Sequence, residues 1–157
     1  MDVLRDVVKS LYQEDFVLRH EQKDAVLSVL CRRDTLVVLP TCFGKSLVCN
    51  VIPRVMDELR RPLEPNARSI VLVVSPLIAL MEDQVGRLTG LGLSGARWHP
   101  GLTDANRIHF EQGDYEIVFV SPESLELPPC RKLLSSPFYQ RNVKCIAVDE
   151  AHCVPNW

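Results

Sequence analysis

The stretch TLVVLPTCFGKS, residues 35–46, decides how this chain is expected to fold. Its first five residues form an apolar run, which predicts a buried strand. The Gly-Lys-Ser at its end opens a predicted helix over residues 45–59, with a kink at Pro53. A strand, a tight loop and a helix that begins with these residues form the arrangement of a phosphate-binding loop, whose backbone N–H groups bind anions.

The residues of this loop indicate particular contacts with a nucleotide. Lys45 would reach the β- and γ-phosphates, and the hydroxyl of Ser46 would bind Mg²⁺. The loop departs from the usual pattern, because Leu39 stands where the first glycine is expected, and Cys42 and Phe43 occupy positions that glycine often fills. An ordinary turn with a surface lysine is the alternative, and the apolar strand before the loop argues against it.

The rest of the chain alternates between apolar runs and helical patterns. Further strands are expected over residues 70–74, 117–120 and 143–148, with a weaker one over 95–98. Helices are expected over residues 2–13, 22–31, 77–88 and 103–112, and short proline-interrupted helices over 121–134. Thr103 is a plausible N-cap. This alternation predicts an α/β fold with a three-layer, doubly wound and mainly parallel sheet. Its ligand site is expected at the carboxyl ends of the strands.

Two carboxylates follow the last of these apolar runs. Asp149 would hold Mg²⁺ through water, and Glu150 would orient or deprotonate the attacking water. The alternative is that Asp149 only caps the next helix. With a phosphate-binding loop upstream, the pair is better explained as the second half of a nucleotide-hydrolysing site.

Length and composition limit the other possibilities. The chain has 157 residues, 18 Lys and Arg against 20 Asp and Glu, and six cysteines. A formal charge of −2 excludes a strongly cationic nucleic-acid-binding protein, although a local basic groove remains compatible with it. No apolar run reaches the ~18 residues of a membrane span, and the N-terminus lacks the apolar region of a signal peptide. Without a CxxC pair, no structural zinc is expected, and an intracellular setting is the simplest interpretation.

Several segments together resemble RecQ-type DNA helicases of superfamily 2. DEAHC at residues 149–153, followed by Trp157, resembles helicase motif II. VSPLIALMEDQV at 74–85 is similar to motif Ia, and VSPESL at 120–125 resembles motif Ib. PTCFGKSL at 40–47 resembles motif I, and LRHEQ at 18–22 is similar to motif 0. The resemblance implies a partial helicase ATP-binding domain of the RecA-like P-loop NTPase class over 16–157, and the helix expected from spacing forms an N-terminal segment within residues 1–15.

The resemblance also implies roles for individual residues. Gln22 and Arg19 would contact adenine, and the remaining ATP contacts would come from Thr41, Cys42, Phe43, Gly44, Lys45 and Ser46. Lys45, Asp149, Glu150 and His152 would form the catalytic set, with Ser46 and Asp149 serving Mg²⁺ and His152 coupling nucleotide state to DNA. The backbone of single-stranded DNA would meet Ser75, Pro76, Gln84, Ser121, Pro122 and Glu123. Each Ser-Pro pair also fits a simple helix start.

The family's activity is ATP hydrolysis coupled to 3′→5′ DNA unwinding, with roles in DNA repair and recombination and, in a eukaryote, a nuclear location. The chain stops after motif II, so it would lack the second RecA-like lobe and its arginine fingers. It would also lack the sheet strand that follows motif II, which leaves a gap or an unpaired apolar edge. A partner helicase lobe or chain is therefore expected. The alternative is a non-catalytic nucleotide- or DNA-binding module, or a helicase remnant without turnover.

Overall fold

The computed structural model describes residues 2–40 and 43–151. The chain divides into two compact units, residues 1–67 and 68–157, which are described separately. The roles expected for Thr41, Cys42 and His152 fall on residues outside the described part. None of the described helices is long and apolar enough to span a membrane.

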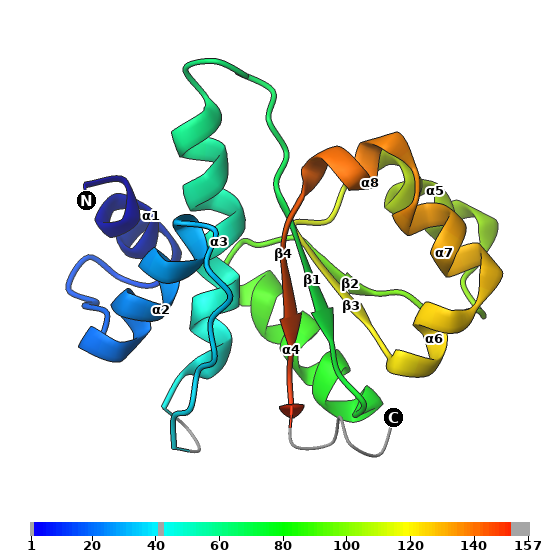
Figure 1. The fold of residues 1–157 in the computed structure, drawn as a ribbon, viewed down its shortest axis with the longest axis horizontal. Helices are drawn as coiled ribbons and strands as arrows, with labels where there is room; N and C mark the ends of the chain where they lie inside the picture. The colour runs from blue at the N-terminus through cyan, green and yellow to red at the C-terminus, as the bar shows by residue number, and fades with distance from the viewer. Residues whose placement is uncertain (1, 41–42, 152–157) are drawn as a thin grey trace. The chain divides into compact units, whose positions relative to one another are not determined.

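The first unit is built from helices (Figure 1). They are α1 (Asp2–Leu11), α2 (His20–Leu30) and α3 (Lys45–Arg60), and α3 packs against both of the others. One face of α1 buries Leu4, Val7, Val8 and Leu11, at the spacing of an amphipathic helix. The two helical patterns in the first 31 residues and the helix after the phosphate-binding loop are thus confirmed, with small shifts in their ends.

The prediction of a strand over residues 35–39 is wrong. These residues form no strand, and the side chains of Leu36 and Val38 are 83% and 82% exposed. An apolar run becomes a strand only when another strand takes up its backbone hydrogen bonds. No strand among the described residues does so here, and the hydrophobic pattern alone could not reveal this.

The second unit contains a four-stranded sheet in which every pair of neighbours is parallel (Figure 1). Its strands are β1 (Ile70–Val74), β2 (Gly95–Arg97), β3 (Ile117–Val120) and β4 (Val143–Val148), in the order β2-β3-β1-β4. Every residue of β1 and β3 is buried, which explains why both are continuous apolar runs. The predicted α/β class is confirmed, and the four strands predicted after residue 69 all form.

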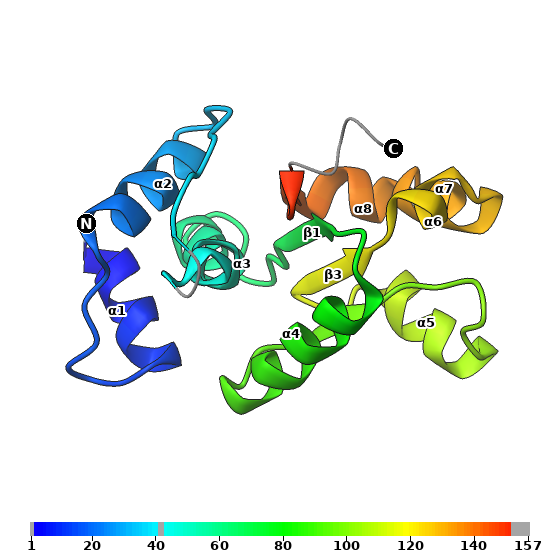
Figure 2. The ribbon, with the colours of Figure 1, turned by 90° about the horizontal axis from the view of Figure 1, so that it is seen from below.

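Helices cover both faces of this sheet. Helix α4 (Ile78–Gly90) lies on one face, and the short helices α6 (Pro122–Glu126), α7 (Pro128–Leu134) and α8 (Pro137–Asn142) lie toward the other (Figure 2). The close approach of α4 to β2 requires a glycine, because a Cβ on Gly95 would stand 2.3 Å from Cδ1 of Leu88. Helix α5 (Asp104–Gln112) begins at Thr103, whose hydroxyl accepts a hydrogen bond from Asn106 N, as predicted.

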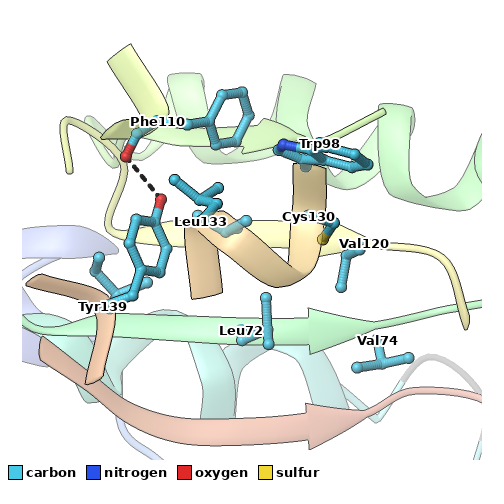
Figure 3. Packing of buried hydrophobic residues seen from close by; sticks show 10 residues of the cluster. Leu72, Val74, Trp98, Phe110, Val120, Cys130, Leu133 and Tyr139 are labelled. Atoms are coloured by element: carbon cyan, nitrogen blue, oxygen red, sulfur yellow. Dashed lines mark hydrogen bonds between the residues drawn. The ribbon is translucent and has the colours of Figure 1, made fainter. Parts of the chain in front are cut away.

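A hydrophobic cluster fills the space on the side of the sheet opposite α4 (Figure 3). It joins alternate residues of β1 and β3 to Trp98, Phe110 of α5, and Cys130 and Leu133 of α7. Tyr139 of α8 is 1% exposed, and its hydroxyl donates a 2.9 Å hydrogen bond to the carbonyl of Phe110. A buried phenol needs such a partner, so this contact fixes how α8 meets α5.

Strand β4 forms one edge of the sheet in the described part of the chain. Ile146 and Val148 are 64% and 45% exposed, whereas β1 beside it is buried throughout. Among the described residues, β4 is thus an edge strand that carries exposed apolar side chains.

A glycine at the end of α5 gives a sharp test of this packing. Gly113 has φ +69°, and a Cβ there would lie 2.1 Å from the ring of Phe138. Gly113→Ala should lower the free energy of unfolding by about 2–4 kcal/mol, from the left-handed conformation and the overlap together. Gly90→Ala is the control: nothing lies within 4 Å of its Cβ position in α4, so it should stabilise by about 0.5–1 kcal/mol. Equal effects in urea unfolding would contradict the packing.

Candidate functional site

The phosphate-binding loop leads into α3 in a conformation suited to anions. Gly44 is the N-cap and has φ +77° in the left-handed region, and Lys45 begins the helix. Gly44, Lys45 and Ser46 are exposed. The ammonium of Lys45 donates a 3.2 Å hydrogen bond to the carbonyl of Leu39, within the same loop. The first N–H groups of a helix have no partner inside it, so this end of α3 offers donors and a positive charge to a phosphate.

Gln22 connects helix α2 to this loop. Its side chain is 3% exposed, and its amide nitrogen donates to the carbonyls of Phe43 at 2.9 Å and Gly44 at 3.4 Å. Its amide oxygen accepts a 3.0 Å hydrogen bond from Arg19 N. A Cβ on Gly44 would stand 2.7 Å from the same amide nitrogen, so glycine is needed there for two reasons. In this structure the adenine-contact residue expected from the sequence holds the loop.

Arg19 also contacts the loop, through an aromatic side chain. Its guanidinium carbon lies 3.8 Å from the centre of the Phe43 ring, a cation–π contact. Phe43 stands where glycine is common in such loops. Its ring therefore has a structural role here, and it places Arg19 beside the residues expected to hold phosphate.

Asp149 lies in the second unit, directly after β4. Its N–H donates to the carbonyl of Val74 at 2.9 Å, which continues the β1–β4 ladder by one step. One carboxylate oxygen accepts a 3.2 Å hydrogen bond from Gln84 of α4, and the other accepts a 3.0 Å hydrogen bond from Glu150 N. No lysine or arginine is ion-paired with Asp149 among the described residues. The carboxylate is thus oriented by neutral donors and keeps lone pairs for a further partner.

Glu150 has an unusual backbone conformation. Its φ is +53°, in the left-handed region that non-glycine residues rarely adopt. Such conformations cost about 1–3 kcal/mol and are concentrated at functional sites.

The Ser-Pro pairs behave differently at the two strand ends. Ser121 caps α6, since its hydroxyl accepts from Ser124 N at 3.3 Å, and Pro122 takes the first helical position. The helix-start interpretation is therefore confirmed there, and Glu123 beside it is exposed. It is wrong at Ser75-Pro76, because α4 has Leu77 as its N-cap. Ser75 is 0% exposed, and its hydroxyl has no hydrogen-bond partner among the described residues.

The donor set at Asp149 and Glu150 fits one kind of metal ion. No group of three or more His, Cys, Asp and Glu residues that could hold a metal occurs among the described residues. Mg²⁺ is usually bound through one or two carboxylates together with substrate phosphates and water. One oriented aspartate beside a glutamate meets that requirement, whereas zinc would need more protein ligands.

Sequence reasoning did not find three of these contacts. Gln84 was expected on a DNA path, yet its amide is bonded to Asp149, 65 residues away. The Gln22 bond to Phe43 spans 21 residues, and the Arg19–Phe43 contact gave no signal in the sequence. The only available hint was that Gln84 shares a helix face with apolar Met81 and Leu88, where an unpaired amide would be costly.

Comparison with protein families gives a match over most of the chain. The sequence model of the family described as DEAD/DEAH box helicase matches residues 19–157. This range includes the phosphate-binding loop and the acidic pair, and it omits most of the segment before α2.

Individual relatives share about a third of their aligned residues with this chain. The ATP-dependent DNA helicase RecQ of Synechocystis is 35% identical over 98% of this chain and 30% of its own length. The probable ATP-dependent DNA helicase RecS of Bacillus subtilis is 34% identical over 87% of this chain and 25% of its own length. The human ATP-dependent DNA helicase Q4 is 35% identical over 88% of this chain and 11% of its own length. The chain thus spans less than a third of each relative.

Proposed function

Because the chain belongs to the DEAD/DEAH box helicase family, we propose that it is the ATP-binding lobe of a RecQ-type DNA helicase. The observation that carries this proposal is the start of α3. A left-handed Gly44 turns the loop into the helix, and exposed Lys45 and Ser46 occupy its first turn. A surface lysine in an ordinary turn would need neither this glycine nor the buried Gln22 behind it.

The loop residues account for nucleotide binding. When a nucleotide binds, the Lys45 ammonium would leave the Leu39 carbonyl and donate to phosphate oxygens, which carry more negative charge. Backbone N–H groups at the start of α3 would donate to the same phosphates, and the Ser46 hydroxyl would be a ligand for Mg²⁺. Arg19 and Gln22 lie beside the loop and form the adenine side of the site. Thr41 and Cys42 belong to the same loop in the sequence.

The acidic pair accounts for hydrolysis. Asp149 would hold Mg²⁺, and Glu150 would orient the attacking water and accept its proton. Mg²⁺, when bound, supplies positive charge to the phosphate oxygens as the bond to the leaving group breaks. The fixed orientation of Asp149 supports this role, because hydrogen bonds from neighbouring groups set the direction of a metal-binding carboxylate.

Single-stranded DNA is the proposed second ligand, bound along the carboxyl ends of β1 and β3. Leu77, the N-cap of α4, has no side-chain capping bond, and Leu77 and Ile78 are 52% and 53% exposed. The first N–H groups of α4 are therefore suited to backbone phosphates, which carry no sequence information. Pro76, Ser121, Pro122 and Glu123 lie at the same edge of the sheet, while the hydroxyl of Ser75 is buried.

A proline at the first position of α4 tests the DNA contact. Ile78→Pro removes one N–H donor at a position where proline suits a helix, and Leu77 before it is already extended. We expect affinity for a labelled single-stranded oligonucleotide to fall about 10- to 150-fold, because one hydrogen bond to a charged group is worth about 1.5–3 kcal/mol. Fluorescence anisotropy measures it at low and high salt.

Ile78→Ala is the matched control, because it removes the side chain and keeps the N–H group. It should bind the oligonucleotide within about twofold of the original chain, since base-independent contacts come from the backbone. Equal losses in both variants would place the DNA contact elsewhere. Absence of any salt-dependent binding by the unmodified, folded chain would refute the DNA part of the proposal.

DNA unwinding in the 3′→5′ direction is proposed for the whole helicase. It requires a second RecA-like lobe that closes on ATP and supplies the arginine finger. That lobe is therefore the partner we propose for this one. In a eukaryotic cell such a helicase would act in the nucleus, in DNA repair and recombination.

A further inference from the structure

Gln84 occupies a position on α4 that is otherwise apolar. It lies three residues after Met81 and four before Leu88, which are 0% and 2% exposed, so the three share the face of α4 that packs on the sheet. An amide at such a position must find partners. Gln84 finds one in Asp149, at 3.2 Å from its amide nitrogen.

Asp149 has neutral polar neighbours on this face of the sheet. Val73 of β1 pairs with Ala147 of β4, so the next pair of residues on the same face is Ser75 and Asp149. The Asp149 N–H bond to Val74 confirms that the ladder continues this far. Ser75 is fully buried there, with a hydroxyl that has no partner among the described residues. In the described part of the chain, the carboxylate is thus held by an amide and a backbone N–H, and no lysine or arginine is ion-paired with it.

We propose that Gln84 is a positioning residue for the metal-binding carboxylate of Asp149. This inference rests on the proposed function, in which Asp149 serves Mg²⁺. By donating to one oxygen, the amide fixes the plane of the carboxylate and leaves a lone pair on each oxygen for metal-bound water. A neutral donor holds the group without neutralising it, as an arginine would. Outer-shell partners of this kind typically change metal affinity by about 10- to 100-fold.

Gln84→Met tests the role, since methionine has a similar length and no donor. Binding of a fluorescent ATP analogue is titrated with Mg²⁺ and, separately, measured in excess EDTA. We expect the Mg²⁺ concentration for half-maximal binding to rise about 10-fold, with affinity in EDTA and affinity for single-stranded DNA unchanged. Gln112→Met makes the same chemical change at an exposed position of α5 and should alter none of these. Gln84→Asn, whose shorter amide does not reach Asp149, is the second variant if Gln84→Met does not fold.

The possible outcomes separate this inference from the function it rests on. If the Gln84 variants lose affinity for DNA and keep their Mg²⁺ dependence, Gln84 is a DNA contact and the inference is wrong. If they match the unmodified chain in every titration, it is also wrong. If the unmodified, folded chain binds the nucleotide equally well with Mg²⁺ and in EDTA, the role of Asp149 in the proposed function fails, and this inference fails with it.

Discussion

Lys45→Ala should weaken binding of Mg·ATP by about 100-fold or more, because hydrogen bonds to charged groups are worth about 1.5–3 kcal/mol each and Lys45 would make two. Its hydrogen bond to the carbonyl of Leu39 is exposed. The variant should therefore keep the thermal stability of the unmodified chain within about 1 kcal/mol. Isothermal titration calorimetry gives the affinity, and circular dichroism gives the stability.

Lys132→Ala is the matched control for this experiment. Lys132 is an exposed lysine of α7. Its replacement removes the same positive charge as Lys45→Ala and leaves the phosphate-binding loop unchanged. It should leave the affinity for Mg·ATP unchanged. A loss of similar size in both variants would mean that general charge, rather than the loop, attracts the nucleotide.

Tyr139→Ala should have the largest effect on stability. Tyr139 is one of the largest fully buried side chains, and removing an aromatic side chain from a core costs about 3–5 kcal/mol. Tyr139→Phe keeps the ring and loses the hydrogen bond to Phe110, so it should cost only about 1–1.5 kcal/mol. Urea unfolding measures both. Similar costs for the two variants would show that the hydroxyl, rather than the ring, supports α8.

Alkaline pH should distinguish Tyr139→Phe from the unmodified chain. Burial, together with Cys130 and Tyr115 nearby, raises the pKa of the Tyr139 phenol well above its usual 10.0. The unfolded chain would then release this proton near pH 10 while the folded chain keeps it. The contribution of the raised pKa to the free energy of unfolding is complete below that pH and is lost as the pH rises above it. Tyr139→Phe should therefore lose less stability than the unmodified chain on going above pH 10.

Local patterns predicted the parts of the fold that depend on local chemistry. The apolar runs of β1, β3 and β4 and the Thr103 cap of α5 were all found at the expected positions. Residues 35–39 have the same kind of pattern and form no strand, because pairing depends on a partner that the pattern does not contain. Strand β4 shows the converse: it has a partner in β1 and forms a strand, although its apolar residues Ile146 and Val148 are exposed.

The sequence allowed the candidate site residues to be proposed, but not the contacts that these residues make. The loop glycine and the acidic pair were proposed from motif spacing, and the acidic pair does follow a strand, β4, whereas no strand precedes the loop among the described residues. The contacts of Gln22 and Gln84 join residues 21 and 65 positions apart, and no local pattern encodes such distances. The left-handed Glu150 was also unpredictable, because strained conformations depend on the surrounding structure.

Calorimetric titration of the unmodified chain with Mg·ATP tests the central claim most directly. We predict a single site with a micromolar dissociation constant, and a clearly weaker one when EDTA removes the metal. Circular dichroism on the same sample shows that the protein is folded. Absence of binding heat at several temperatures, from folded protein, would contradict the account, because the loop at Gly44 and Lys45 would then not be a nucleotide site.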